Sequence, residues 1–178
     1  MANVSRVNGF RPVKHLNGSP FNGQANIYEV PAGEAIPVFI GDLVQLSTVT
    51  PTSNYPAVKN VATATTANNV AAAPVLGAVL GVFNAKVDID GKMTTGSISL
   101  DLPIYRPAST KQFVLVADSP DLVFEVQATA SFAIADIGLN ADIASADMTT
   151  SGALTTGASP QTVATTAASA SATRPLQV

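Results

Sequence analysis

Short runs of β-branched and aliphatic residues, each closed by a tight-turn signal, recur along this chain and constrain its fold more than any other feature. The runs at 74–83 and 116–127 are the strongest. β-Branched residues favour extended backbone, whereas Gly, Asp and Pro favour sharp reversals at strand ends. Helix start and stop signals are scarce. The pattern therefore predicts an all-β fold.

Alternating apolar and polar residues give the expected strand positions. Asn26-Ile-Tyr-Glu-Val30 alternates in this way, and 57–61 is a weaker candidate. The runs 113–117 and 122–126 are joined by Asp118-Ser-Pro-Asp121, a turn sequence, so they are expected to pair as adjacent antiparallel strands. We expect strands near residues 26–30, 37–46, 74–83, 96–104, 112–117, 121–127 and 173–178.

Glycines and prolines divide the chain into an arm and one domain. Residues 1–24, called the arm below, hold so many turn-forming residues that no long regular element is expected there. Residues 25–178 are expected to form a single β domain with long surface excursions at 47–73 and 128–172. At most short turns of helix are expected within 128–147. The closing hexapeptide, Thr173-Arg-Pro-Leu-Gln-Val178, is expected to pair with a sheet edge.

The composition is poor in charge. Only 12% of the 178 residues are charged, against roughly 25% in ordinary soluble domains. Such a surface is prone to association, so we expect much of it to face neighbouring subunits in a homo-oligomer. A net charge of −3 with scattered basic residues argues against nucleic acid as a partner. The apolar run at 74–83 is too short to cross a membrane, and the first residues lack a signal-peptide core.

No catalytic constellation emerges. The chain has no cysteine, and His15 is its only histidine, placed in the turn-rich arm. Acidic residues sit where strands end, where turn capping explains them without catalysis. Asp88-Ile-Asp-Gly91 resembles the start of a calcium loop, but the later acid is missing because Ser99 stands in its place. We therefore expect no enzyme activity, no cofactor and no metal.

The arm carries the best candidates for contact with a partner protein. It combines apolar side chains with basic ones in a segment that cannot form its own core. Two interpretations are equally open: the apolar residues fold back on the chain's own core, or they dock on another subunit. The candidate contact residues are Arg6, Phe10, Arg11, Val13, Lys14, Leu16 and Phe21.

Several of these segments together resemble the decoration, or cement, proteins of tailed-bacteriophage capsids. The resemblance rests on Asn8-Gly-Phe-Arg-Pro12, Leu16-Asn-Gly-Ser-Pro-Phe-Asn-Gly23, Phe39-Ile-Gly-Asp-Leu-Val44, Gly77-Ala-Val-Leu-Gly-Val-Phe83 and the run 116–127, and extends through 137–142 to the closing hexapeptide. It implies a small β-barrel or β-tulip fold. It also implies a virion protein on the outer capsid surface, made in the bacterial cytoplasm, which clamps major capsid protein subunits, often as a homotrimer.

A second function class remains open from the sequence. A receptor- or glycan-binding module on a virion surface would need a concave polar site with aromatic side chains. The chain has no tryptophan and three tyrosines, which supplies such a site poorly. Binding to bare phage heads, compared with binding to host cells or glycans, would separate the two classes.

Overall fold

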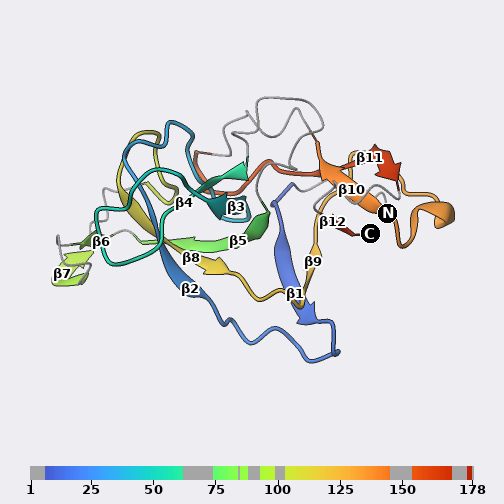
Figure 1. Cartoon of the computed structure of the whole chain (residues 1–178), viewed down its shortest axis with the longest axis horizontal. Coiled ribbons are helices and arrows are strands. Elements are labelled where there is room, and N and C mark those ends of the chain that lie inside the picture. The colour runs from blue at the N-terminus through green and yellow to red at the C-terminus, as the bar shows by residue number, and fades with distance from the viewer. Residues whose placement is uncertain are drawn as a thin grey trace.

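The computed structural model describes residues 7–61, 74–83, 85–87, 93–98, 103–144, 154–169 and 176–177. Within these ranges the chain is all-β, as predicted: it holds no α-helix, and η3 (Ile134–Asp136) is a short 3-10 turn. The strands form one five-stranded sheet and three smaller ones (Figure 1). The predicted strands between 96 and 104 and between 173 and 178 lie partly outside the described residues.

The main sheet is antiparallel, with strand order β2-β8-β5-β3-β4. It curls strongly, because β-bulges interrupt its register beside Val44 and between Val79 and Gly81, and bulges increase local twist. The outer strands approach each other at one isolated bridge, between Glu29 and Ala57. The sheet is therefore barrel-like, although its described strands do not close into a continuous barrel. Its strands are β2 (Asn26–Val30), β3 (Leu43–Leu46), β4 (Val58–Asn60), β5 (Val75–Val82) and β8 (Gln112–Ala117).

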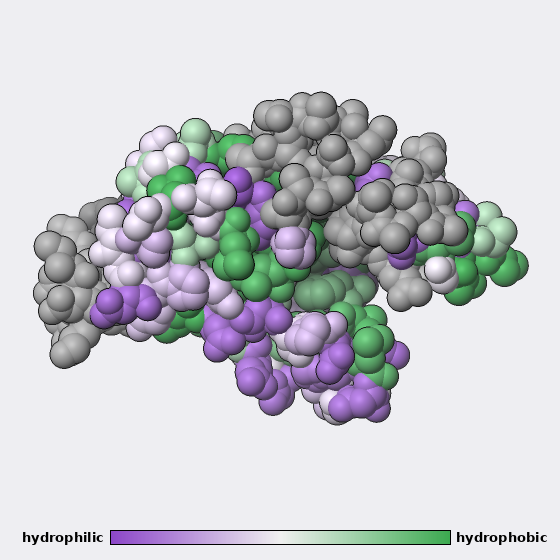
Figure 2. Space-filling view, viewed as in Figure 1, coloured by the Kyte–Doolittle hydropathy of each residue, from purple (hydrophilic) through white to green (hydrophobic). Residues whose placement is uncertain are grey.

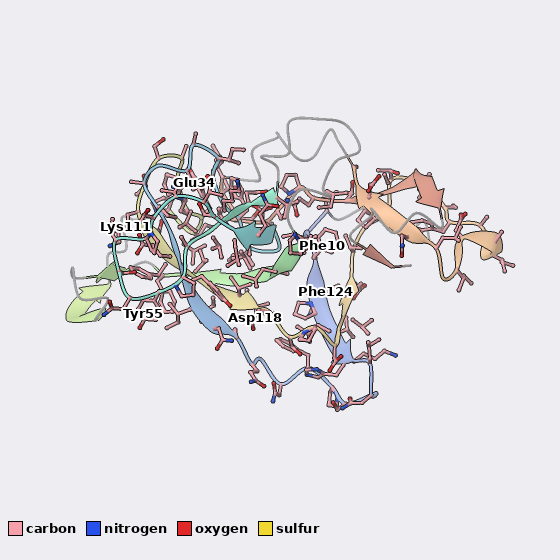
Figure 3. All side chains as sticks on the ribbon, in the orientation of Figure 1. Phe10, Glu34, Tyr55, Lys111, Asp118 and Phe124 are labelled. Carbon is pink, nitrogen blue, oxygen red and sulfur yellow. The ribbon has the colours of Figure 1, made fainter. Side chains whose placement is uncertain are left out.

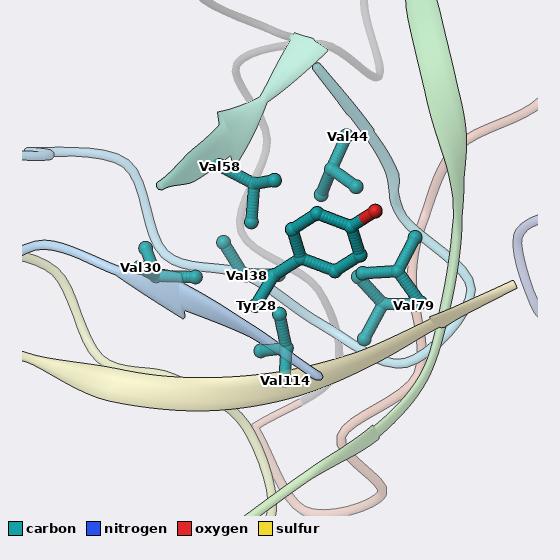
Figure 4. Close-up of a cluster of buried hydrophobic side chains, with 8 residues drawn as sticks. Tyr28, Val30, Val38, Val44, Val58, Val79 and Val114 are labelled. Carbon is teal, nitrogen blue, oxygen red and sulfur yellow. The ribbon is translucent and has the colours of Figure 1, made fainter. Parts of the chain in front are cut away.

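Valine side chains fill the inside of this curled sheet (Figure 4). Valine has one branched carbon close to the backbone, so it packs well on a pleated surface and loses little rotamer freedom there. Each fully buried valine removes apolar surface from water, a contribution of about 1.5 kcal/mol or more. The cluster consists of Tyr28, Val30, Val38, Val44, Val58, Val79, Val114 and Val116.

A second core lies where two of the smaller sheets meet the main one. It contains Phe10, Leu43, Ala141 and Ile143, and Phe124 packs against it. The smaller sheets have the orders β1-β9, β11-β10-β12 and β6-β7. Their strands are β1 (Arg11–His15), β6 (Ala85–Val87), β7 (Met93–Ile98), β9 (Leu122–Glu125), β10 (Asn140–Ile143), β11 (Val163–Ser169) and β12 (Leu176–Gln177).

The expected hairpin between 112–117 and 121–127 is wrong. Both strands exist, but β8 pairs with β2 and β5, whereas β9 pairs with β1 from the arm. The turn sequence between them ends β8 without folding β9 back onto it. The run 121–127 consequently does not line the main sheet, and Phe124 packs on the second core instead.

The expected strand 37–46 is interrupted. Val38 and Ile40 make isolated bridges, and a regular strand begins only at Leu43, because Gly41 turns the chain with a φ of 93°. Positive φ values of this kind are open to glycine and strained for other residues. The excursion expected over 128–172 also holds two unpredicted strands, β10 and β11. β12 pairs with β10, so the expected pairing of the closing segment with a sheet edge is confirmed.

One arginine is fully buried beside the main sheet. The Arg106 guanidinium donates to the backbone carbonyls of Pro31, Ile36 and Thr110, each at 2.7 Å. Burial lowers the pKa of Arg106 to about 10, and the nearby Glu34 carboxylate opposes that shift. Three carbonyl acceptors replace the lost water, which makes burial of this charge tolerable. The arginine thereby fixes two loops to each other.

Gly77 provides a test of how tightly the main sheet packs. A Cβ atom placed on Gly77 would lie 2.0 Å from the carbonyl oxygen of Ala117, whereas one on Gly81 would meet only Leu115 Cδ1 at 3.8 Å. We expect Gly77→Ala to lower the free energy of unfolding by about 1–3 kcal/mol or more, and Gly81→Ala to change it by less than about 0.5 kcal/mol. Urea denaturation measures both, and equal effects would contradict this packing.

Candidate functional site

The arm and β9 form a two-stranded ribbon that projects from the main sheet (Figures 1 and 3). We define the ribbon as β1, the turn at residues 16–20, Phe21 and β9. β1 and β9 pair antiparallel, with Arg11 opposite Glu125 and His15 opposite Leu122. The space-filling view shows this projection with hydrophilic side chains beside a hydrophobic patch (Figure 2).

A β-bulge exposes Val13. The register of the ribbon shifts between Pro12 and Lys14, so Val13 has no direct partner on β9. Bulges re-aim the side chain of the extra residue. Val13 is 46% exposed, which is unusual for a β-branched side chain on a strand with a pairing partner. The bulge therefore turns an apolar side chain outward instead of into the core.

The turn at the tip holds Leu16 in solvent. The backbone N–H of His15 donates to Ser19 O at 2.8 Å, and the N–H of Leu16 donates to Asp121 O at 2.8 Å. Asn17 Oδ1 accepts from the backbone N–H and the hydroxyl of Ser19, an Asx-type turn. These bonds fix the backbone at the tip, yet the Leu16 side chain is 73% exposed. The tip thus presents a large apolar side chain on an ordered turn.

Phe10 anchors the base of the ribbon. Its side chain is 3% exposed and meets the Phe124 ring edge-on, with ring centroids 6.4 Å apart. Its backbone N–H donates to Gly41 O at 2.8 Å. Gly9 and Gly41 pass so close that a Cβ on Gly9 would lie 2.4 Å from Gly41 O. Only glycine at both positions permits this approach, which fixes the point where the arm leaves the core.

Asp42 organises the backbone corner that receives Phe10. Its Oδ2 accepts from the backbone N–H of Phe39 at 2.8 Å and from Asn60 Nδ2 at 2.7 Å. The expected turn-capping role is therefore confirmed for Asp42. Burial raises the pKa of Asp42 to about 7, although hydrogen bonds from the Ser159 hydroxyl and the Phe39 N–H oppose the shift. The next residue, Leu43, donates its N–H to Gln161 Oε1 at 2.8 Å, which brings in the C-terminal part of the chain.

The predicted contact residues divide into distinct groups. Arg11, Val13, Lys14 and Leu16 are exposed on the ribbon. Phe21 is half-buried, with its ring centroid 6.3 Å from that of His15. Arg6 lies outside the described residues.

Phe10 requires a correction as a partner contact, because it is buried in the second core. Of the two interpretations of the arm's apolar residues, folding back therefore holds for Phe10. Docking on another subunit stays a prediction for Val13 and Leu16.

The ribbon carries charges of both signs. Arg11 and Lys14 lie on β1, whereas Asp121 and Glu125 lie at or on β9. No ion pair joins these basic and acidic groups in the part of the chain that the structure describes. Exposed charges of this kind steer association and set orientation more than they add affinity. The apolar Val13 and Leu16 side chains therefore supply the larger share of any contact energy.

Sequence reasoning missed a second exposed apolar site. Ile134 is 89% exposed and Ile137 is 71% exposed, both at η3, which lies at the far end of the molecule from β7 (Figures 1 and 2). The sequence places these isoleucines in the excursion 128–172, just before Gly138 and Asn140, which only suggest a loop. Their exposure is set by the 3-10 turn and could not be read from composition.

Other kinds of site find no support in the described residues. Among them, no group of three or more His, Asp or Glu side chains is placed to hold a metal ion. The same residues include no helix with the length and apolar character needed to cross a membrane.

Comparisons with models of protein families, with curated proteins and with solved structures found no match to this chain. Its candidate site therefore stands on its own geometry.

The Asp42 carboxyl gives a pH-dependent test of the corner beneath the ribbon. Because its folded pKa of about 7 exceeds the ordinary value of 3.8, the folded state holds a proton that the unfolded state releases. This contribution to stability is full below the unfolded pKa and is lost as pH rises through 7. Between about pH 5 and pH 7 we expect the free energy of unfolding to fall by up to about 1.4 kcal/mol per pH unit.

Urea denaturation at successive pH values measures this slope, and Asp42→Asn is the matched control. The variant lacks the titrating group, so its profile should be flatter than that of the wild type over the same range. Parallel profiles for the two proteins would contradict the assignment to Asp42.

Proposed function

We propose that this chain is a non-enzymatic structural protein that decorates the outer surface of a phage head and bridges neighbouring major capsid protein subunits. The observation that carries the proposal is the ribbon: its base is locked into the core by Phe10, while Leu16 at its tip is 73% exposed. An ordered, projecting apolar side chain suits insertion into a pocket or seam on another protein. The resemblance of the arm and strand motifs to capsid decoration proteins supplies the kind of partner.

The physical consequence of such binding is stabilisation of the assembled shell. A protein that binds across a seam binds the assembled state and not the separated subunits, so it shifts the equilibrium toward assembly. Repetition over a lattice multiplies a modest contact, because each copy acts at its own seam. The contact does not need many charges, which agrees with a chain that is only 12% charged.

The proposal includes self-association on the particle, most simply as a homotrimer. The number three comes from the resemblance. The case for more than one copy comes from the charge-poor composition and from apolar side chains in solvent, such as Ile134 at 89% and Ile137 at 71% exposure. Apolar surface of this kind promotes contact between molecules.

Removal of the apolar tip tests the proposal directly. We expect Leu16→Asp to weaken binding of the purified protein to bare phage heads by at least about tenfold, because burying a leucine side chain contributes about 1.5–3 kcal/mol. Co-sedimentation of protein with heads at increasing concentration measures the change. Thermal unfolding should be nearly unchanged, since the Leu16 side chain faces solvent.

The matched control is Leu46→Asp, the same substitution at an exposed leucine on β3 in the main sheet. It should bind heads as the wild type does. Equal binding by wild type and Leu16→Asp would remove the ribbon from the contact. Binding to host cells or glycans, without binding to heads, would favour the receptor-binding alternative.

A further inference from the structure

Three Asn-Gly pairs occur in the arm: Asn8-Gly9, Asn17-Gly18 and Asn22-Gly23. Asn-Gly is the dipeptide in which an asparagine side chain converts most readily, because glycine has no side chain to hinder attack by its backbone nitrogen. In an unfolded chain the three pairs would react at similar rates. The structure gives each pair a different environment, so it predicts which one reacts.

The reaction begins when a base removes the proton from the glycine backbone nitrogen. That nitrogen attacks the asparagine Cγ, and ammonia leaves as a five-membered succinimide ring closes. Water then opens the ring at either carbonyl, giving aspartate or isoaspartate. The net change consumes one water, releases ammonia and adds one negative charge. It requires a free glycine N–H and room for the ring.

The first pair lacks that room. Gly9 is buried against Gly41 and Ser159, and a Cβ on Gly9 would lie 2.5 Å from Ser159 Cβ. A Cβ on Gly41 would likewise lie 2.4 Å from the Asn8 carbonyl oxygen. Ring closure would have to push apart the corner that anchors Phe10. The fold therefore protects Asn8.

The second pair is exposed but held by hydrogen bonds. The Gly18 N–H donates to His15 O at 2.9 Å, and Asn17 Oδ1 accepts from the N–H and the hydroxyl of Ser19. Attack by the Gly18 nitrogen would first break its own bond and then rotate the Asn17 amide away from Ser19. Loss of one such bond costs about 1 kcal/mol net, or about fivefold in rate.

In the described part of the chain, the third pair has neither the crowding found around Gly9 nor a hydrogen bond from its glycine N–H. Asn22 and Gly23 are exposed, and no atom lies within 4 Å of a Cβ placed on Gly23. Within the described residues the Gly23 N–H donates no hydrogen bond. Asn22 Oδ1 accepts one bond, from the Gln24 N–H at 3.1 Å, which is the counterpart of the Ser19 N–H bond to Asn17. The second pair is therefore held by two further bonds that the third lacks among these residues, one from the Ser19 hydroxyl and one from the Gly18 N–H. We propose that Asn22 is a site of spontaneous succinimide formation, where the folded protein acquires aspartate or isoaspartate.

The location gives the change a structural consequence. Residues 22–25 connect the ribbon to β2 without a strand of their own (Figure 1). Isoaspartate would lengthen this connection by one backbone carbon and place a carboxylate next to Phe21. The net charge of −3 would become one unit more negative, and the new charge would lie in the arm, whose charged residues Arg6, Arg11 and Lys14 are all basic.

Peptide mapping by mass spectrometry tests the proposal. The purified, full-length protein is incubated at about pH 8 and 37 °C, and the three Asn-Gly pairs are followed in one sample, with isoaspartate detected by enzymatic methylation. We expect Asn22 to convert at least about fivefold faster than Asn17, and Asn8 to stay intact over the same period. Conversion of Asn17 at the same rate as Asn22, or faster, would overturn the proposal.

A parallel incubation in concentrated urea separates the effect of the fold from that of the local sequence. There the three rates should converge, because the protection of Asn8 and Asn17 depends on folded contacts. Persistence of the same order in urea would show that the structure does not select Asn22, which would also overturn the proposal. Asn22→Gln is the matched variant, in which the signal from the third pair should vanish while Asn17 keeps its rate.

Discussion

Four segments that are distant in the sequence meet at the corner formed by Gly41 and Asp42. Gly41 O accepts from the arm at Phe10, and the Gly41 N–H donates to Val79 O in the main sheet. The Asp42 carboxyl accepts hydrogen bonds from Asn60 Nδ2 on β4 and from the hydroxyl of Ser159. A buried carboxyl is tolerated only when donors replace its water. The hydrogen bonds to this carboxyl and to the adjacent Gly41 backbone thus hold the arm, the main sheet and the C-terminal part together.

The sequence predicted the elements whose signal is local. β2 appears where the alternating run 26–30 places it, β8 matches the expected strand 112–117, and β5 matches the long apolar run almost to its ends. In each case several β-branched residues lie between turn-forming residues, and their preference for extended backbone does not depend on the partner strand. Gly77 permits the main sheet a close backbone approach to Ala117. Local chemistry was sufficient for these features.

The sequence did not predict pairing, because pairing is set by contacts over long sequence separations. The turn at 118–121 resembles a hairpin turn, yet β9 gains more by pairing with β1, where Phe124 meets the second core. β11 was not predicted because its Thr, Ser and Ala residues lack the bulky side chains that are typical of strands. Its extended backbone is stabilised by pairing with β10. For the candidate site, the arm was identified from composition, but the split between buried Phe10 and exposed Val13 depends on a bulge that leaves no sequence signal.

The molecule buries several polar side chains and exposes several large apolar ones. Arg106 and Asp42 are buried and hydrogen-bonded, whereas Leu16 and Ile134 face solvent. The hydrogen bonds of buried polar groups are directional, so they specify one arrangement of loops. The contacts of exposed apolar groups are not directional, so these groups suit contact with a surface of matching shape. Stability and the proposed partner contact therefore involve different residues of the same short arm: Phe10 is buried in the core, and Leu16 is exposed. A partner that engages the tip gains from an arm already ordered by the core, because little conformational entropy remains to be lost on binding.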